Sequence, residues 1–202
     1  MGARILIFLT TLMFWAVASA AEESRNAELS GQACVGCDGE DGTGRAQTEA
    51  ARGAALLAPM KTELKQALMA GMQKGPLNAI SVCKVQAPEI ADSLSIDGIK
   101  IGRTSHRLRN PENRAPEWVN VVLQAYLSEE KGRAPQVVSL ANDREGYVEP
   151  ITMKPICLAC HGENLAADVA TQINTLYTED EATGFEVDEL RGVFWAEYPV
   201  AE

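Results

Sequence analysis

Apolar residues in the first half of the chain recur at the spacing of helices. Between residues 45 and 72 they fall at steps of three and four, which predicts one long amphipathic helix ended by a Gly-Pro pair. A second helix is expected to begin at Asn78, a suitable N-cap, and to carry Cys83 on its apolar face. Pro88 is expected to kink or break this second helix. The apolar face of the first helix comprises Leu57, Met60, Leu64, Leu68 and Met72.

The rest of the chain mixes short alternating stretches with helical ones. Alternating apolar and polar positions predict a strand at residues 96–106. Strands at residues 136–140 and 146–153 are expected on either side of an Asn142-Asp143 turn, and a final strand region at 185–198 is expected after a Thr183-Gly184 turn. Helical spacing predicts two further helices, at residues 116–126 and 164–177. Because helices and strands do not follow a regular strand–helix–strand order, we expect an α+β fold.

The N-terminus has the pattern of a secretory signal peptide. Arg4 precedes an apolar stretch at residues 5–17, and small residues then offer a cleavage site after about Ala20. The alternative is an uncleaved N-terminal anchor. We therefore expect a periplasmic protein with a signal peptide at residues 1–20, a flexible segment at 21–44 and one domain at 45–202. No other apolar run approaches about 18 residues, so no membrane span is expected after cleavage.

The charge balance narrows the range of partners. The formal net charge of the chain is −10 at pH 7, which makes nucleic acid an unfavourable partner and favours basic ones. The simpler interpretation is that the acidic surface keeps the protein soluble. The sequence leaves open whether the protein forms a homodimer.

The pentapeptide from Cys157 to His161 has the form Cys-x-x-Cys-His, which is typical of c-type haem attachment. Cys157 and Cys160 would bind the two vinyl groups of one porphyrin, and the imidazole of His161 would be the proximal ligand of the iron. The alternative is a surface disulfide or half of a zinc site beside an incidental histidine. Export favours the haem interpretation, because c-type attachment occurs in exported proteins. We therefore expect one covalent haem c.

The other cysteines have no such partner histidine. Cys34 and Cys37 are followed by Asp38, so a local disulfide is favoured over a degenerate second haem site or a redox-active dithiol. Cys83 then remains unpaired, which is unusual in an exported protein.

Several side chains are candidates for the sixth position of the iron. Cys83 and His106 are the main alternatives, and sequence spacing alone does not choose between them. Either could instead be a structural residue. The methionines are also available, although those of the first helix lie at core spacing. The candidate methionines are Met60, Met69, Met72 and Met153.

Four separated blocks of the chain resemble a bacterial family of exported single-haem domains that was long labelled as of unknown function. The blocks lie, in the family's order, at Ala79–Cys83 with Ala87-Pro88, at Gly102–Ser105 with Arg109–Pro111 and Asn113, at Pro155–Gly162, and at Asp180–Phe185 with Arg191-Gly192. The resemblance implies a PAS-like fold, with an antiparallel sheet flanked by helices. It further implies thioether attachment, a proximal histidine, and a distal cysteine that corresponds to Cys83.

The same resemblance suggests which residues face the cofactor. The block that begins at Arg103 looks like a haem-side loop, so Arg103 and Arg109 are candidates to pair with the propionates, since guanidinium groups suit carboxylates. Surface arginines are the alternative. A cysteine thiolate on the iron would imply a low reduction potential.

These features favour a redox-responsive or gas-responsive haem sensor. Carbon monoxide or nitric oxide would bind where the reduced iron loses its thiolate, and the signal would pass to a separate signalling partner. The alternative is a soluble periplasmic electron-transfer cytochrome with an unidentified redox partner. An enzyme such as a peroxidase fits worse, because two axial side chains block the iron.

Overall fold

The computed structural model describes residues 42–128 and 133–201. The signal peptide predicted at residues 1–20, nearly all of the segment at 21–44, and the Cys34/Cys37 pair lie outside the described residues. Those interpretations remain predictions. Among the described residues, no helix combines the length and the apolar character that crossing a membrane requires.

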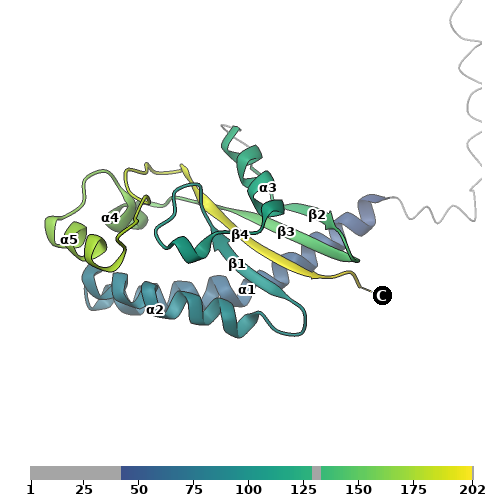
Figure 1. Ribbon diagram of the computed structural model, residues 1–202, viewed down its shortest axis with the longest axis horizontal. Helices are drawn as coiled ribbons and strands as arrows, with labels where there is room; N and C mark the ends of the chain where they lie inside the picture. The colour runs from purple at the N-terminus through teal and green to yellow at the C-terminus, as the bar shows by residue number, and fades with distance from the viewer. Residues whose placement is uncertain (1–41, 129–132, 202) are drawn as a thin grey trace, which may run out of the picture. The chain divides into compact units, whose positions relative to one another are not determined.

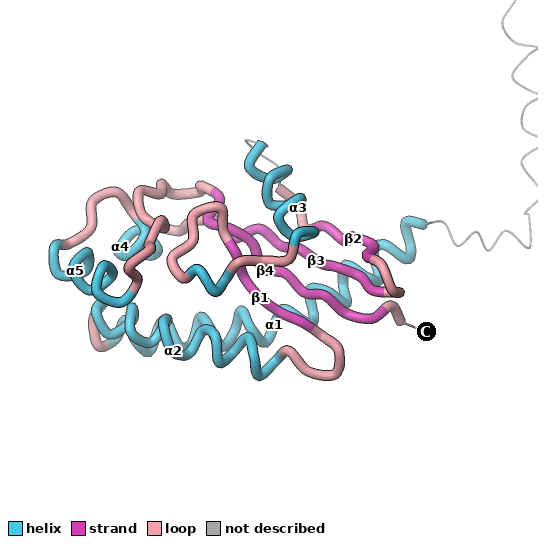
Figure 2. Tube along the Cα trace, in the orientation of Figure 1, coloured by secondary structure: helices cyan, strands magenta, loops and turns pink. Residues whose placement is uncertain are grey.

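Four antiparallel strands form one sheet in the order β1-β4-β3-β2 (Figures 1 and 2). The hairpin between β2 and β3 turns at Asn142 and Asp143, which both have positive φ angles, as asparagine and aspartate tolerate in tight turns. Both β1 and β4 begin later than predicted, because Asp97 and Asp188 form turns with positive φ just before them. The strands are β1 (Lys100–Thr104), β2 (Gln136–Leu140), β3 (Arg144–Thr152) and β4 (Leu190–Pro199).

Helices cover both faces of this sheet. The long pair α1 and α2 packs on one face, where Leu57 meets Tyr147 and Ala196 in a buried cluster. Helix α3 packs on the other face, where Val122 meets Val193. The helices are α1 (Gly42–Gln73), α2 (Pro76–Leu94), α3 (Glu117–Ser128), α4 (Leu158–His161) and α5 (Ala167–Leu176), with short 3₁₀ turns η1 (Pro111–Asn113) and η2 (Pro155–Cys157). The predicted α+β, PAS-like fold with an antiparallel sheet and a long first helix is confirmed.

The predicted start of α2 at Asn78 and a break at Pro88 are both wrong. The helix is capped by Gly75 and begins at Pro76 instead of at Asn78, because proline suits the first helical position, where its missing N–H has no partner to lose. Pro88 does not break the helix, which continues to Leu94. Packing of α2 against α1 offsets the one backbone hydrogen bond that proline removes. The two helices approach so closely that a Cβ on Gly71 would lie 2.7 Å from the Cα of Ala79.

Candidate cofactor site

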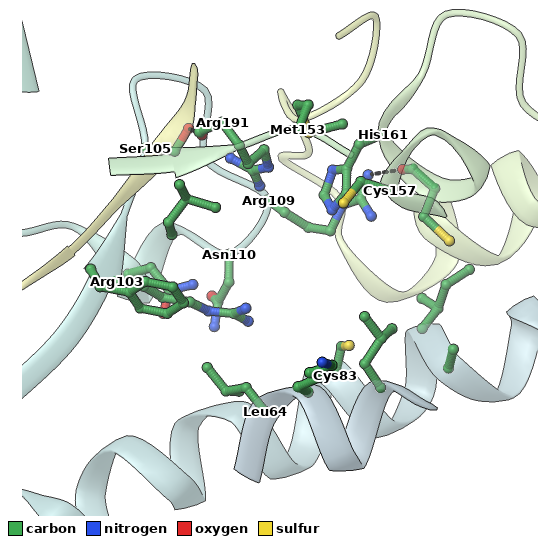
Figure 3. Close-up of a pocket in the computed structure, with 18 of the residues that line it drawn as sticks. Leu64, Cys83, Arg103, Ser105, Arg109, Asn110, Met153, Cys157, His161 and Arg191 are labelled. Atoms are coloured by element: carbon green, nitrogen blue, oxygen red, sulfur yellow. Dashed lines mark hydrogen bonds between the residues drawn. The ribbon is translucent and has the colours of Figure 1, made fainter. Parts of the chain in front are cut away.

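A cavity of about 340 Å³ lies between the α1–α2 pair and the segment that follows β3. This volume is at the low end of the roughly 300–1,000 Å³ that sites for small ligands and cofactors occupy. The six side chains that the family resemblance assigns to the haem all line the cavity, although they come from distant parts of the chain. They are Cys83, Arg103, Arg109, Cys157, Cys160 and His161, of which Figure 3 labels all but Cys160.

The Cys-x-x-Cys-His segment forms a single turn of helix. Cys157 ends η2 and the other two residues lie in α4, so their spacings of three and four place all three side chains on one helical face. The segment lies between strand β3 and helix α5, as the predicted strand at residues 146–153 and helix at 164–177 imply. Gly162 ends α4, and a Cβ there would lie 2.8 Å from the carbonyl oxygen of Leu158.

The imidazole of His161 is held in one orientation. Its Nδ1 lies 2.7 Å from the carbonyl oxygen of Ala182, and an acceptor at that distance places the ring proton on Nδ1. The lone pair of Nε2 is then available to a metal ion, as in other metal-binding histidines. Burial, followed by the charges of Arg191 and Arg109, holds the pKa of His161 well below its usual value. The ring is therefore neutral, as a metal ligand must be.

Cys83 reaches the cavity from α2, on the wall that faces His161 (Figure 3). Its thiol is free and half-buried. Burial raises the pKa of Cys83, and the charges of Arg103 and Arg109 offset part of that rise. A metal ion at the site would favour the thiolate form, because a coordinated thiol loses its proton.

Basic side chains dominate the charged lining of the cavity. Lys61, Lys65, Arg103, Arg109 and Arg191 line it, and none of the described residues in the lining carries a carboxylate. Lys61 is paired with Glu149 at 2.8 Å. The guanidinium of Arg103, by contrast, forms no hydrogen bond or ion pair within residues 42–128 and 133–201, and burial lowers the pKa of this group. Such a lining suits an anionic ligand, and a porphyrin brings two propionates.

Arg109 lines the cavity but already has partners within the protein. Its guanidinium pairs with Asp180 and donates hydrogen bonds to the backbone carbonyls of Cys160 and Ala182. These contacts tie it to the wall that carries His161. The predicted pairing with a propionate stays a prediction, and Arg103 has more donors available for that role.

Some of the alternative sixth ligands line the cavity and others do not. His106 is not part of the lining, and its ring packs edge-on against Phe185 at 5.8 Å between centroids. Met60 is buried in the core, as its spacing predicted. Met69 is 43% exposed, so the core role predicted for it is wrong; its position on α1 points away from the packed face. Met72 and Met153 do line the cavity.

Three residues near the cavity were not given a role by sequence reasoning. Arg191 lines the cavity because β4 carries an extra residue there, where Ile151 pairs with Gly192 and Thr152 pairs with Leu190. Asp180 holds Arg109, and Lys65 reaches the cavity from α1. Asp180 and Arg191 stand in the sequence blocks that carry the family resemblance, which is the signal that pointed to them. Lys65 has no such signal.

The donor set fits a covalently bound haem. Two thiols share a helical face with a neutral imidazole whose Nε2 is free, a third thiol faces them, and the charged lining is basic. Covalent attachment requires the two thiols and the imidazole, and the porphyrin propionates require the cations.

Comparison with known proteins supports the resemblance that the sequence blocks carry. The family described as Tll0287-like matches residues 25–199. The crystal structure of the cyanobacterial heme-protein Tll0287 shares 22% sequence identity with this chain, with a TM-score of 0.51 over 72% of this chain and 94% of that chain. At this identity, the likeness establishes the fold. No curated protein matches the chain. Because the family match spans most of its length, the chain belongs to the Tll0287-like family.

Proposed function

We propose that the chain is an exported protein that carries one covalent haem c. Cys157 and Cys160 would hold the porphyrin through thioether bonds, and His161 would be the proximal ligand. The observation that carries the proposal is that these three side chains share one cavity with the lone thiol of Cys83. The related structure is described as that of a heme-protein, which supports the same cofactor class here.

The two axial side chains would differ in how firmly they are held. His161 directly follows the second attachment cysteine, Cys160, and its Nδ1 is fixed by the Ala182 carbonyl. Cys83 depends on α2 alone. Haem supplies one-electron redox chemistry and a coordination position that carbon monoxide or nitric oxide can occupy. Cys83 is therefore the ligand that would be exchanged, and α2 is the element that would sense the exchange.

This asymmetry favours a redox-responsive or gas-responsive sensor. Movement of Cys83 would pass to α2, which packs against α1 and α5. Displacement of the thiol would thereby alter a surface made of helices, and a separate partner would read that surface. Because both axial positions are assigned to side chains, the proposal gives the chain no catalytic activity.

Absorption spectra of the wild type and of Cys83→Ser, in both oxidation states, test the ligand set. We expect a low-spin ferric spectrum with thiolate character that Cys83→Ser abolishes. His106→Ala is the matched control and should leave the spectrum unchanged, because His106 does not line the cavity. If His106→Ala changes the spectrum and Cys83→Ser does not, the assignment of the sixth ligand is wrong.

A second experiment separates the sensor from an electron carrier. The reduction potential and the ligands of the reduced protein should be measured together. Loss of the Cys83 ligand on reduction, followed by binding of carbon monoxide or nitric oxide, is the outcome expected of the sensor. Unchanged ligands with fast electron self-exchange would instead indicate an electron-transfer protein.

A further inference from the structure

One backbone carbonyl beneath the proposed haem ligand accepts hydrogen bonds from two side chains. The oxygen of Ala182 lies 2.7 Å from Nδ1 of His161 and 3.1 Å from Nη2 of Arg109. Ala182 is fully buried, so water does not compete for this oxygen. The imidazole and the guanidinium therefore share a single acceptor.

Arg109 is held at this carbonyl by a closed set of contacts. Its Nε lies 2.9 Å from Oδ1 of Asp180, and its Nη2 also donates to the carbonyl of Cys160 at 2.6 Å. Asp180 in turn accepts the backbone N–H of Ala182 at 3.0 Å. The side chains of Arg109 and Asp180 are only 12% and 5% exposed. Figure 3 shows Arg109 on the same side of the cavity as His161.

The contacts of Arg109 are not needed to fasten the segment at residues 180–185 to the Cys-x-x-Cys-His motif. The segment is already joined to the motif by backbone bonds from Phe185 to His161 and from Gly184 to Gly162, at 2.9 and 3.0 Å. A buried ion pair is also weak support for stability, because the loss of hydration offsets much of the attraction. The location of Arg109, on the acceptor that His161 uses, therefore needs another explanation.

A second hydrogen-bond donor makes a carbonyl oxygen a weaker acceptor for the first donor. A charge-assisted bond from guanidinium draws electron density from the oxygen, and the oxygen then attracts the Nδ1 proton of the imidazole less. The partner of a ligating histidine sets its basicity, because a stronger acceptor makes the ring a stronger electron donor. Stronger donation stabilises oxidised iron and lowers the reduction potential.

We propose that Arg109 is a positioning residue that limits the electron donation of His161 through the Ala182 carbonyl, with Asp180 balancing its charge. The proposal rests on the haem function proposed above. Arg109 raises the reduction potential, because it weakens the acceptor and adds positive charge. Asp180 lowers the potential, because its carboxylate neutralises part of that charge.

The test compares the reduction potentials of Arg109→Gln and Asp180→Asn in the full chain. We expect Arg109→Gln to lower the potential and Asp180→Asn to raise it. Each shift should correspond to a change of about tenfold in the reduction equilibrium, or about 59 mV for one electron. If Arg109 and Asp180 only fasten the loop, both variants loosen the same contacts. Shifts of the same sign, or no shift in either variant, would overturn the proposal.

Two further variants separate the shared carbonyl from charge alone. Arg109→Lys keeps the positive charge but lacks the planar guanidinium that donates to several acceptors at once. It should therefore lower the reduction potential less than Arg109→Gln does. Arg191→Gln removes another cavity cation that does not contact Ala182, and it should leave the Nδ1–H resonance of His161 unchanged. If Arg109→Gln also leaves that NMR resonance unchanged, the relay through the carbonyl is wrong, whatever the potential does.

The NMR measurement also distinguishes failure of this inference from failure of the haem proposal. The Nδ1–H of His161 can be observed in the full chain as purified, with or without bound haem. A purified chain without haem contradicts the proposed function, while a shifted Nδ1–H signal in Arg109→Gln still supports the shared acceptor. Far-UV circular dichroism confirms that each variant folds. If Arg109→Gln does not fold, Arg109→Lys carries the test in both measurements.

Discussion

Replacement of Gly192 by alanine should disturb both the sheet and the cavity. Gly192 has a φ angle of 156°, which residues with a side chain rarely adopt. It directly follows Arg191, the extra residue of β4 at this point of its pairing with β3. A Cβ on Gly192 would lie 2.1 Å from the carbonyl oxygen of Thr104 and 3.1 Å from the Cα of Ser105. Ser105 also donates to the carbonyl of Arg191 at 2.6 Å, so any shift there moves the neighbouring cation.

The magnitude follows from two separate costs. An unfavourable φ angle costs about 1–3 kcal/mol. The overlap with a backbone oxygen requires β1 to move by on the order of 1 Å, and such overpacking costs about 1–3 kcal/mol. Gly192→Ala should therefore lower the free energy of unfolding by about 2–6 kcal/mol, a large part of the roughly 5–15 kcal/mol that most domains possess.

Gly98→Ala is the matched control for the overlap. Its φ angle is 76°, and the nearest atom to a new Cβ lies 3.8 Å away on Pro199, so it carries the backbone cost without the collision. Urea denaturation, monitored by circular dichroism, gives both free energies, and an unchanged m-value confirms that the unfolding reaction is the same. If Gly192→Ala costs no more than Gly98→Ala, the close approach at Thr104 is not real.

Two further predictions concern groups that burial affects. Burial, with the nearby Glu49 and Glu145, raises the pKa of Tyr198 to about 12. Because the usual pKa of tyrosine is about 10, the neutral phenol stabilises the fold fully below pH 10. This contribution is lost as the pH rises toward 12. Tyr198→Phe should cost about 1 kcal/mol at pH 7, by removing a hydrogen bond to the carbonyl of Glu49, yet should unfold less steeply above pH 10 in a pH titration of stability. Arg103→Leu should raise the melting temperature of the haem-free chain and reduce the stabilisation that haem provides, because Arg103 has no partner among the described residues. A lower melting temperature for haem-free Arg103→Leu would refute this account of the cation.

Much of the fold could be predicted because its pattern is local. Residues 136–140 were predicted as a strand beside Asn142 and Asp143, and both of these residues tolerate the backbone of the turn that joins β2 to β3. The course of α2 was predicted less well. Its continuation through Pro88 depends on packing against α1, and no local pattern reports that contact.

The site was predictable in part, and for a different reason. The Cys-x-x-Cys-His spacing is a local signature, whereas Cys83 lies far from it in sequence, and spacing alone did not choose between Cys83 and His106. The resemblance to a family favoured Cys83, and the structure places that thiol in the lining while His106 lies outside it. The carbonyl of Ala182 could not be predicted, because a backbone acceptor leaves no trace in residue identity.

The charge of the cavity lining is opposite in sign to the net charge of the whole chain. The chain as a whole has a net charge of −10, which would favour basic partners but is explained most simply by solubility. The cavity reverses that sign, because five basic side chains line it and none of the described lining residues carries a carboxylate. Surface charges are screened beyond about 10 Å in 0.1 M salt, but charges in a cavity are screened much less. The lining therefore decides what enters the cavity, and it favours an anion such as a porphyrin with two propionates. The acidic exterior acts on a different event, which is the encounter with a partner protein.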